Sequence, residues 1–314
     1  MRESIARRSL AGILAVAAAS ALTVWSAGTA AAVGTPPGFG AGATGGGNAS
    51  PVTVSNASAL IDAMQSDGAA VIRVNGMISI SGMQDVASDK TLIGVGSGSG
   101  ITGGGLDIDE ANNVIVQNLN FRDWSDDAIN VQDGSTDIWI DHNSFSNGND
   151  GAVDIKRGSD FITVSWNRFF DHDKTMLLGH SDDNADQDRG HLRVSYHHNW
   201  FDGTGQRHPR VRFGDPVHVY NNYYDGVGDY GVASTMEAGV LVEGNYFENT
   251  DSPCELGQGD SPEGSLVARN NHFVDSGSCA TGGSVNGIPY SYSLDPASSV
   301  KSIVESGAGT GKVA

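Results

Sequence analysis

The sequence contains few cysteines, few basic residues and a single long apolar run. Only Cys254 and Cys279 occur in 314 residues, and a metal site needs more ligands than this pair provides. The chain has 18 Lys and Arg residues against 37 Asp and Glu residues, a formal net charge of −19. This acidity excludes general binding of nucleic acid, which requires a basic surface.

The one long apolar run lies at the beginning of the chain. Arg2, Arg7 and Arg8 precede an apolar stretch at 10–25, and small residues follow as far as Ala32. This order is typical of a secretory signal peptide, and the apolar part is too short for a membrane anchor. We therefore predict cleavage after Ala32 and a secreted, extracellular protein, by either the general or the twin-arginine export route.

Residues 33–314 contain no second long apolar run, so we expect a protein that does not associate with a membrane. Their length allows two domains, but a single all-β domain can also be this long. We expect one domain at 33–314 and a monomer. A signal peptide implies an oxidising compartment, in which Cys254 and Cys279 are predicted to form a disulfide.

An internal repeat dominates the middle of the chain. Six segments share the order apolar, x, apolar, x, x, Asn, x, aromatic, and a seventh has Leu119 in place of the asparagine. The repeated position falls at 119, 143, 167, 199, 222, 245 and 271, in steps of 24, 24, 32, 23, 23 and 26 residues. The segments are VIVQNLNF, IWIDHNSF, ITVSWNRF, VSYHHNWF, VHVYNNYY, VLVEGNYF and LVARNNHF.

The repeat predicts an all-β solenoid, a right-handed parallel β-helix. Alternation within each unit indicates strands, and a unit that cannot bury its own apolar face must stack on copies of itself. A β-propeller is the lesser alternative, because its blades need about twice this repeat length. Asparagines of successive coils would lie about 4.8 Å apart and form a ladder of amide hydrogen bonds, with the aromatic residues stacked inside.

The ends of such a solenoid need covers. Residues 56–65 are predicted to form a short amphipathic helix that caps the first coil, followed by a strand at 71–80. A second helix is expected within 297–306, packed on the outside.

The basic residues are concentrated in one part of this acidic chain. A local positive cleft would suit a polyanionic ligand, although the same charges could instead lie on different, solvated faces. Nine basic residues fall within 57 positions: Lys156, Arg157, Arg168, Lys174, Arg189, Arg193, Arg207, Arg210 and Arg212.

Carboxylates are also brought together by the repeat. Asp150 and Asp154 lie about one coil after the neighbouring pair Asp126 and Asp127. Stacked coils would place these side chains close together, and calcium, a hard ion with oxygen ligands, is the natural neutraliser. The alternative is that they are acidic turn residues on a solvated surface.

Several motifs in order make the chain resemble the secreted pectate lyases of polysaccharide lyase family 1. They are WIDHNSF, DGAVDIKRGSDFITVSWNRF, HDKTMLLGHSD, LRVSYHHNWF and RHPRVRFGDPVHVYNNYY. The resemblance covers nearly the whole chain after residue 32. It implies calcium-dependent β-elimination of polygalacturonate, the pectate polysaccharide, to 4,5-unsaturated oligogalacturonates.

The resemblance also implies roles for individual residues. Asp127, Asp150 and Asp154 would bind calcium, with Asp126 an alternative to Asp127. In the same way Lys174 and Arg212 would contact the uronate carboxylate, and Arg207 would abstract the proton at C5. His208, beside Arg207, could touch the substrate, whereas Arg210 is expected mainly to bond the scaffold. Lys174 lies in the motif HDKTMLLGHSD, and the arginines and His208 lie in the motif RHPRVRFG.

An arginine acts as a base only if its charged form is penalised. The positive charges of calcium, Lys174 and Arg212 would have this effect, so we expect an alkaline pH optimum. Few residues separate Phe145 from Asp150, where many relatives have a long loop, so one groove wall should be low.

Three other functions remain open from the sequence. A pectin lyase acting on methyl-esterified chains would have basic or neutral groups at 150 and 154, and a β-helical glycoside hydrolase would need paired carboxylic acids rather than Lys174 and Arg207. The third is a non-catalytic β-helix that binds polysaccharide.

Overall fold

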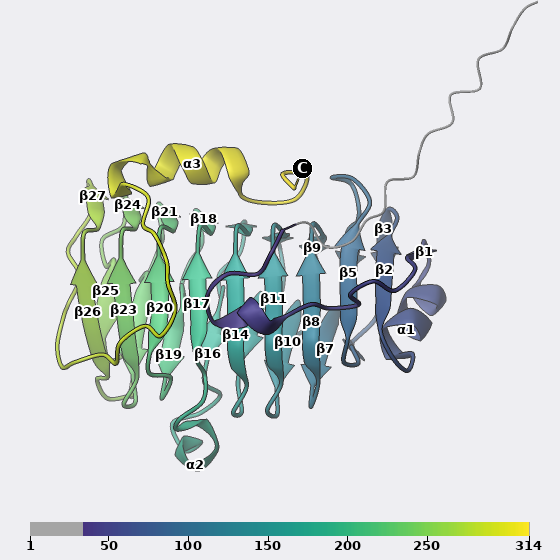
Figure 1. The fold of residues 1–314 in the computed structure, drawn as a ribbon. Helices are drawn as coiled ribbons and strands as arrows, with labels where there is room; N and C mark the ends of the chain where they lie inside the picture. Colours follow the sequence, from purple (N-terminus) through teal and green to yellow (C-terminus); the bar gives the residue numbers. More distant parts are fainter. Residues whose placement is uncertain (1–33, 314) are drawn as a thin grey trace, which may run out of the picture.

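The chain winds into a parallel β-solenoid of three sheets, as the repeat predicted (Figure 1). The computed structural model describes residues 34–313, so the predicted signal peptide at 1–32 lies outside the described residues. Each coil contributes one strand to each sheet, and successive coils pair in parallel. Within the described residues, no helix is long and apolar enough to span a membrane.

The first sheet has ten strands in the order of the chain. They are β1 (Val52–Val54), β2 (Ala70–Val74), β5 (Lys90–Gly94), β8 (Asn112–Gln117), β11 (Thr136–Asp141), β14 (Asp160–Ser165), β17 (Val194–His197), β20 (Val217–Tyr220), β23 (Gly239–Glu243) and β26 (Ser265–Arg269).

The second sheet has nine strands. They are β3 (Met77–Ser79), β6 (Gly100–Thr102), β9 (Asn120–Arg122), β12 (Ser144–Ser146), β15 (Arg168–Phe170), β18 (Trp200–Asp202), β21 (Tyr223–Asp225), β24 (Tyr246–Glu248) and β27 (His272–Val274).

The third sheet has eight strands and carries the candidate site. They are β4 (Met83–Asp85), β7 (Gly105–Asp109), β10 (Ile129–Gln132), β13 (Val153–Ile155), β16 (Leu177–Leu178), β19 (Arg210–Arg212), β22 (Val232–Thr235) and β25 (Cys254–Leu256).

The predicted asparagine ladder is present at the turn between the first and second sheets. Asn143, Asn167, Asn199, Asn222 and Asn245 are fully buried. Each amide donates to the side-chain oxygen of the asparagine one coil on, over 3.0–3.1 Å. The ladder fixes the register of the coils, because every buried amide finds its partner only when the asparagines align.

The aromatic residues two positions later form a second column inside the solenoid. Phe121, Phe145 and Phe169 stack with ring centroids 5.1 and 4.9 Å apart. The column continues through Phe201 and Tyr224. These rings fill the core, so each coil buries its apolar face against the next.

The helical cap at the start of the solenoid is also confirmed. Helix α1 (Ala57–Gln65) begins after Asn56, whose side chain accepts a hydrogen bond from the backbone of Ala59 at 3.0 Å. Leu60 and Met64 of this helix are fully buried. One correction concerns the strand expected at 71–80. The turn at Gly76, with φ +82°, divides it into β2 and β3.

The C-terminal helix packs on the outside, as expected. A 3₁₀ turn, η2 (Ala297–Ser299), leads into α3 (Val300–Gly307), which lies along the outer side of the second sheet (Figure 1). Val300 and Val304 are buried against Tyr223. The predicted disulfide between Cys254 and Cys279 is present, with 4.3 Å between the Cα atoms.

Segments from both ends of the described chain cover the first sheet. The 3₁₀ turn η1 (Gly38–Gly42) crosses β14 and β11, and the stretch before α3 crosses β20 (Figure 1). The backbone of Phe39 donates to the Ser195 hydroxyl at 3.0 Å, and the same hydroxyl lies 2.8 Å from the Tyr290 hydroxyl.

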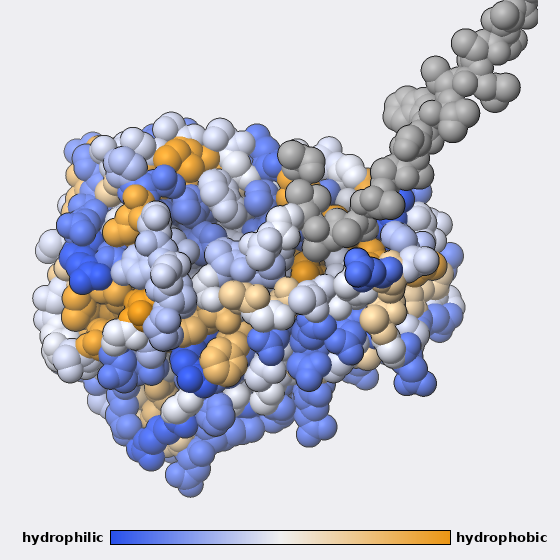
Figure 2. Space-filling view, viewed as in Figure 1, coloured by the Kyte–Doolittle hydropathy of each residue, from blue (hydrophilic) through white to orange (hydrophobic). Residues whose placement is uncertain are grey.

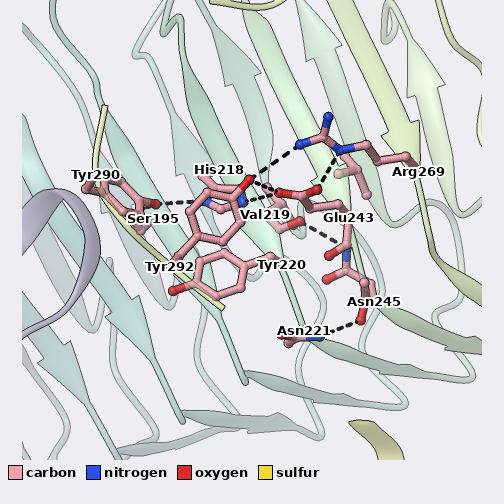
Figure 3. Close-up of polar contacts among 12 residues, drawn as sticks. Ser195, His218, Val219, Tyr220, Asn221, Glu243, Asn245, Arg269, Tyr290 and Tyr292 are labelled. Carbon is pink, nitrogen blue, oxygen red and sulfur yellow. Dashed lines mark hydrogen bonds and ion pairs between the residues drawn. The ribbon is translucent and has the colours of Figure 1, made fainter. Parts of the chain in front are cut away.

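A buried polar network holds the C-terminal stretch in place (Figure 3). The Tyr290 hydroxyl lies 2.7 Å from Nδ1 of His218, whose Nε2 lies 2.9 Å from Glu243. Tyr292 donates to Glu243 at 2.6 Å, and Arg269 donates to its other carboxylate oxygen at 2.6 Å. The C-terminal stretch therefore covers this part of the first sheet.

Candidate functional site

The outward face of the third sheet changes its charge from coil to coil. Asp107, Asn130 and Asp154 are register partners on β7, β10 and β13. Leu177 follows, since its backbone donates to Asp154 at 3.1 Å, and Arg210 pairs with Leu177. Along this row the side chains are therefore acidic or amide on β7, β10 and β13, basic on β19, and acidic again at Glu255 on β25.

Three carboxylates converge next to β10 and β13. Asp126, Asp127 and Asp150 each offer an oxygen, and these oxygens lie within 4.8 Å of one another. Asp126 and Asp127 immediately precede β10, and Asp150 precedes β13 by one turn. The structure therefore brings both members of the adjacent pair to the site, where the sequence left the choice open.

Asp154 lies next to this group without being one of the three converging carboxylates. It is 4 % exposed, and burial together with the charge of Asp127 raises its pKa to about 7. Lys156 and Arg207 act in the opposite direction. Burial likewise raises the pKa of Asp127. A cation beside such buried carboxyl groups would stabilise their charged form.

Lys156 is a member of the site that sequence reasoning missed. Its Nζ lies 3.2 Å from Oδ2 of Asp127. Lys156 follows Asp154 by two residues, and alternation along a strand places such residues on the same face. The signal was therefore present in the sequence, in the spacing of the DIK motif.

Asp150 connects the acidic group with two predicted basic residues. Its Oδ1 lies 3.1 Å from Nζ of Lys174 and 3.8 Å from Nη1 of Arg207. Arg207 adopts φ +64°, a conformation that is uncommon for residues other than glycine. Its Nε is buried and has no hydrogen-bond partner among residues 34–313. The arginine is thus held with its guanidinium directed at the acidic group.

Arg212 lies on the same strand as Arg210 but has a different partner. Its Nε donates to Oδ1 of Asp182 at 2.5 Å, and Nη1 donates to the carbonyl of Gly179 at 3.2 Å. The side chain is 11 % exposed. Asp182 belongs to the insertion that lengthens one repeat step to 32 residues, but nothing in the sequence assigns it to Arg212.

Arg210 bonds the scaffold, as expected, although through neutral groups. Its Nη2 donates to the carbonyl of Gln258 at 3.0 Å and to the Ser261 hydroxyl at 2.8 Å. Arg210 and Arg212 both face outward because Val211, between them, is fully buried.

His208 is not at the surface, which corrects the idea that it touches substrate. It is fully buried, with Nε2 2.8 Å from the Thr204 hydroxyl and Nδ1 2.8 Å from the Tyr230 carbonyl. Burial lowers its pKa to about 3, so the ring is neutral. Its place is structural: it anchors the turn that carries Arg207.

Comparisons with known proteins identify the family of the chain. A sequence profile of the pectate lyase family matches residues 8–313. A pectate trisaccharide-lyase of Bacillus licheniformis is 37 % identical over 294 residues, covering 87 % of this chain and 84 % of that protein. Pectate lyase A of Emericella nidulans is 40 % identical over 258 residues, covering 79 % of this chain and 77 % of that protein.

Solved structures have the same fold. A pectate lyase from Bacillus sp. N165, crystallised in complex with trigalacturonate, superposes with a TM-score of 0.79 at 32 % identity, covering 89 % of this chain and 100 % of that one. Pectate lyase II from Xanthomonas campestris gives a TM-score of 0.76 at 27 % identity, covering 88 % and 98 %. The parallel β-solenoid, the profile match and these relatives together show that the chain belongs to the pectate lyase family.

Proposed function

We propose that this pectate lyase cleaves polygalacturonate by calcium-dependent β-elimination on the outward face of the third sheet. The observation that carries the proposal is the position of Asp150, which belongs to the acidic group and also contacts Lys174 and Arg207. A polymer of uronic acids carries the negative charge that a metal ion and two basic side chains attract. The relative solved with trigalacturonate supports this substrate class.

The donor set fits calcium. Carboxylate oxygens of Asp126, Asp127 and Asp150 lie within 4.8 Å of one another, and a hard ion prefers such ligands. The amide oxygen of Asn130 is buried with no hydrogen-bond partner among the described residues, on the register row of Asp154. We assign Asp127, Asp150 and Asp154 as ligands, with Asp126 as a further oxygen donor. When bound, calcium supplies positive charge beside the reacting uronate and so stabilises negative charge that develops there.

The basic residues would orient the substrate and move the proton. Lys174 and Arg212 would hold the carboxylate of the reacting uronate, next to the carbon that loses its proton. Arg207, 19 % exposed, is the proposed base. Since an arginine acts as a base only when its side chain is deprotonated, an alkaline pH optimum is part of the same proposal.

The reaction balances without an oxidant or reductant. The C5–H bond breaks and its proton passes to the unprotonated nitrogen of a neutral guanidine at Arg207, which thereby becomes a guanidinium. The electron pair forms the C4–C5 double bond while the bond from C4 to the glycosidic oxygen breaks. That oxygen leaves with its bonding pair and takes a proton from water, which gives a 4,5-unsaturated oligogalacturonate.

Export of the enzyme is part of the same proposal. Residues 1–32 have the order of a signal peptide, and a plant cell-wall polysaccharide is found outside the cell that secretes the enzyme. N-terminal sequencing of the protein from the culture medium would check cleavage after Ala32.

One experiment separates this function from its alternatives. The protein is incubated with polygalacturonate, with and without a chelator, while the ultraviolet absorbance of the unsaturated product is followed. We expect absorbance to rise with calcium and to stop on chelation. Activity that resists the chelator would favour a pectin lyase, and unchanged absorbance under both conditions would leave a non-catalytic polysaccharide-binding β-helix.

A further inference from the structure

The ion pair between Arg212 and Asp182 carries an inference beyond the proposed function, on which it rests. Arg212 is proposed to hold a uronate carboxylate, yet its Nε already donates to Oδ1 of Asp182 at 2.5 Å. The two side chains are 11 % and 35 % exposed. A carboxylate of the protein therefore occupies the kind of position that a carboxylate of the substrate would take.

Asp182 is held in this position from a second side. It lies in the segment between β16 and β17 that also contains α2 (Ala185–Asp188), which projects from the lower edge of the solenoid in Figure 1. The hydroxyl of Ser261 lies 2.8 Å from both carboxylate oxygens of Asp182. Arg210 donates to the same hydroxyl at 2.8 Å. Two separate loops thus fix Asp182 over the arginine.

The carboxylate is charged in this setting. Burial alone would raise the pKa of Asp182, but hydrogen bonds from Arg212 and Ser261 hold it below its usual value. The negative charge offsets that of Arg212. Figure 2 shows mainly hydrophilic residues along the lower rim from which α2 projects.

The negative charge of Asp182 beside Arg212 changes which sugar unit this arginine accepts. A free uronate approaching an uncompensated arginine gains a full ion pair, whereas a neutral methyl ester gains only a hydrogen bond. Beside Asp182 the free uronate also meets a like charge, which costs binding energy, and the neutral ester does not. The discrimination between the two units is therefore reduced.

We propose that Asp182 is a specificity-determining residue that lets the sugar unit at Arg212 be methyl-esterified as well as free. The ligand class is partly methyl-esterified polygalacturonate. Specificity here is a ratio of two kcat/KM values, so a general loss of activity does not alter it.

The test compares Asp182→Asn with a matched control, Asp183→Asn. Asp183 is exposed, lies in the same segment and changes the net charge equally, but does not contact Arg212. Initial rates are measured on unesterified pectate and on partly methyl-esterified pectin. We expect Asp182→Asn to raise the ratio of kcat/KM for pectate over that for esterified pectin by about fivefold, the scale of a partly exposed ion pair. Asp183→Asn should leave the ratio unchanged.

Two results would overturn the proposal. One is a ratio that stays the same or falls in Asp182→Asn, since a residue that merely positions Arg212 would lower both rates together. The other is an equal change of the kcat/KM ratio in Ser261→Ala. This variant loses the hydroxyl that holds Asp182 but keeps the charge of Asp182. If Asp182→Asn melts at a lower temperature than the wild type, the same comparison is made with Asp182→Ala.

Failure of the proposed function would be visible separately. Wild-type protein that forms no unsaturated product from either substrate with calcium present contradicts the lyase assignment itself. Calorimetric binding of trigalacturonate and of its methyl ester then tests the role of Asp182 alone. We expect the affinity for trigalacturonate, relative to that for the methyl ester, to rise in Asp182→Asn. An unchanged ratio of affinities would overturn the role of Asp182.

Discussion

Lys174 donates a hydrogen bond from Nζ to Oδ1 of Asp150 over 3.1 Å, and these residues come from consecutive coils. The contact joins a proposed calcium ligand to a proposed substrate contact. Both side chains are partly exposed, at 34 % and 41 %, so a polymer lying along the sheet can reach them. Their proximity predicts that metal and substrate binding depend on one another.

Replacing Asp150 by asparagine should therefore weaken both functions. The change removes one metal ligand and one partner of Lys174 while keeping the shape of the side chain. We expect the calcium concentration for half-maximal activity to rise by about 10- to 100-fold, with a higher KM for pectate at saturating calcium. Calcium titrations of initial rate measure both effects, and a KM equal to that of the wild type would contradict the coupling.

Asp154→Asn should act more narrowly. Asp154 is buried and has no ion-pair partner within residues 34–313, so its loss should weaken calcium binding by about tenfold or more while kcat at saturating calcium stays near that of the wild type. Isothermal titration with calcium checks the affinity. Asp109→Asn, an exposed acid on the same sheet, is the control, and equal affinities in the two variants would remove Asp154 from the ligand set.

The asparagine ladder should contribute strongly to stability. Asn199 accepts from Asn167 and donates to the Val164 carbonyl and to Asn222. Asn199→Ala leaves these buried groups without partners and should lower the free energy of unfolding by about 3 kcal/mol or more. Urea unfolding measures the change. Asn48→Ala, at an exposed position, should stay within about 0.5 kcal/mol, and similar losses in both variants would contradict the importance of the ladder.

Acid should destabilise the fold through its buried histidines. Burial lowers the pKa of His218 to about 4 and that of His208 to about 3, whereas an unfolded histidine titrates near about 6.5. Between these pH values the two histidines are therefore protonated in the unfolded chain but not in the folded one. The free energy of unfolding therefore has its full value above about pH 6.5 and decreases as the pH falls. His218 alone should lower it by about 3 kcal/mol when pH 4 is reached.

Melting temperatures between pH 7 and pH 4.5 check this dependence at constant calcium. The variant His218→Gln should be less stable at pH 7 and should lose less stability on acidification than the wild type. Identical pH profiles would show that the network around Glu243 does not depend on the neutral ring.

The fold could be predicted from the sequence because it repeats. One asparagine recurs in every coil and predicts the same turn each time, at 143, 167, 199, 222, 245 and 271. The aromatic residue two positions later predicts a column of stacked rings inside the solenoid. The repeat could not show that Gly76 divides the strand expected at 71–80, since its pattern resembles continuous alternation.

The site was predictable only where stacking follows from the repeat. Asp126, Asp127 and Asp150 come together because their coils are adjacent. The burial of His208 and the pairing of Arg212 with Asp182 depend instead on contacts made by turns and by an insertion, whose paths the periodicity does not determine.

The role of Arg207 as the base can be tested by measuring turnover and substrate binding separately. The rate of unsaturated product formation by Arg207→Ala is compared with its affinity for trigalacturonate, at saturating calcium. Arg122→Ala, an exposed arginine on β9 without an ion-pair partner among the described residues, serves as the control. We predict that Arg207→Ala binds the trisaccharide normally and loses turnover by about 10²- to 10⁴-fold. A kcat near that of the wild type would contradict the assignment.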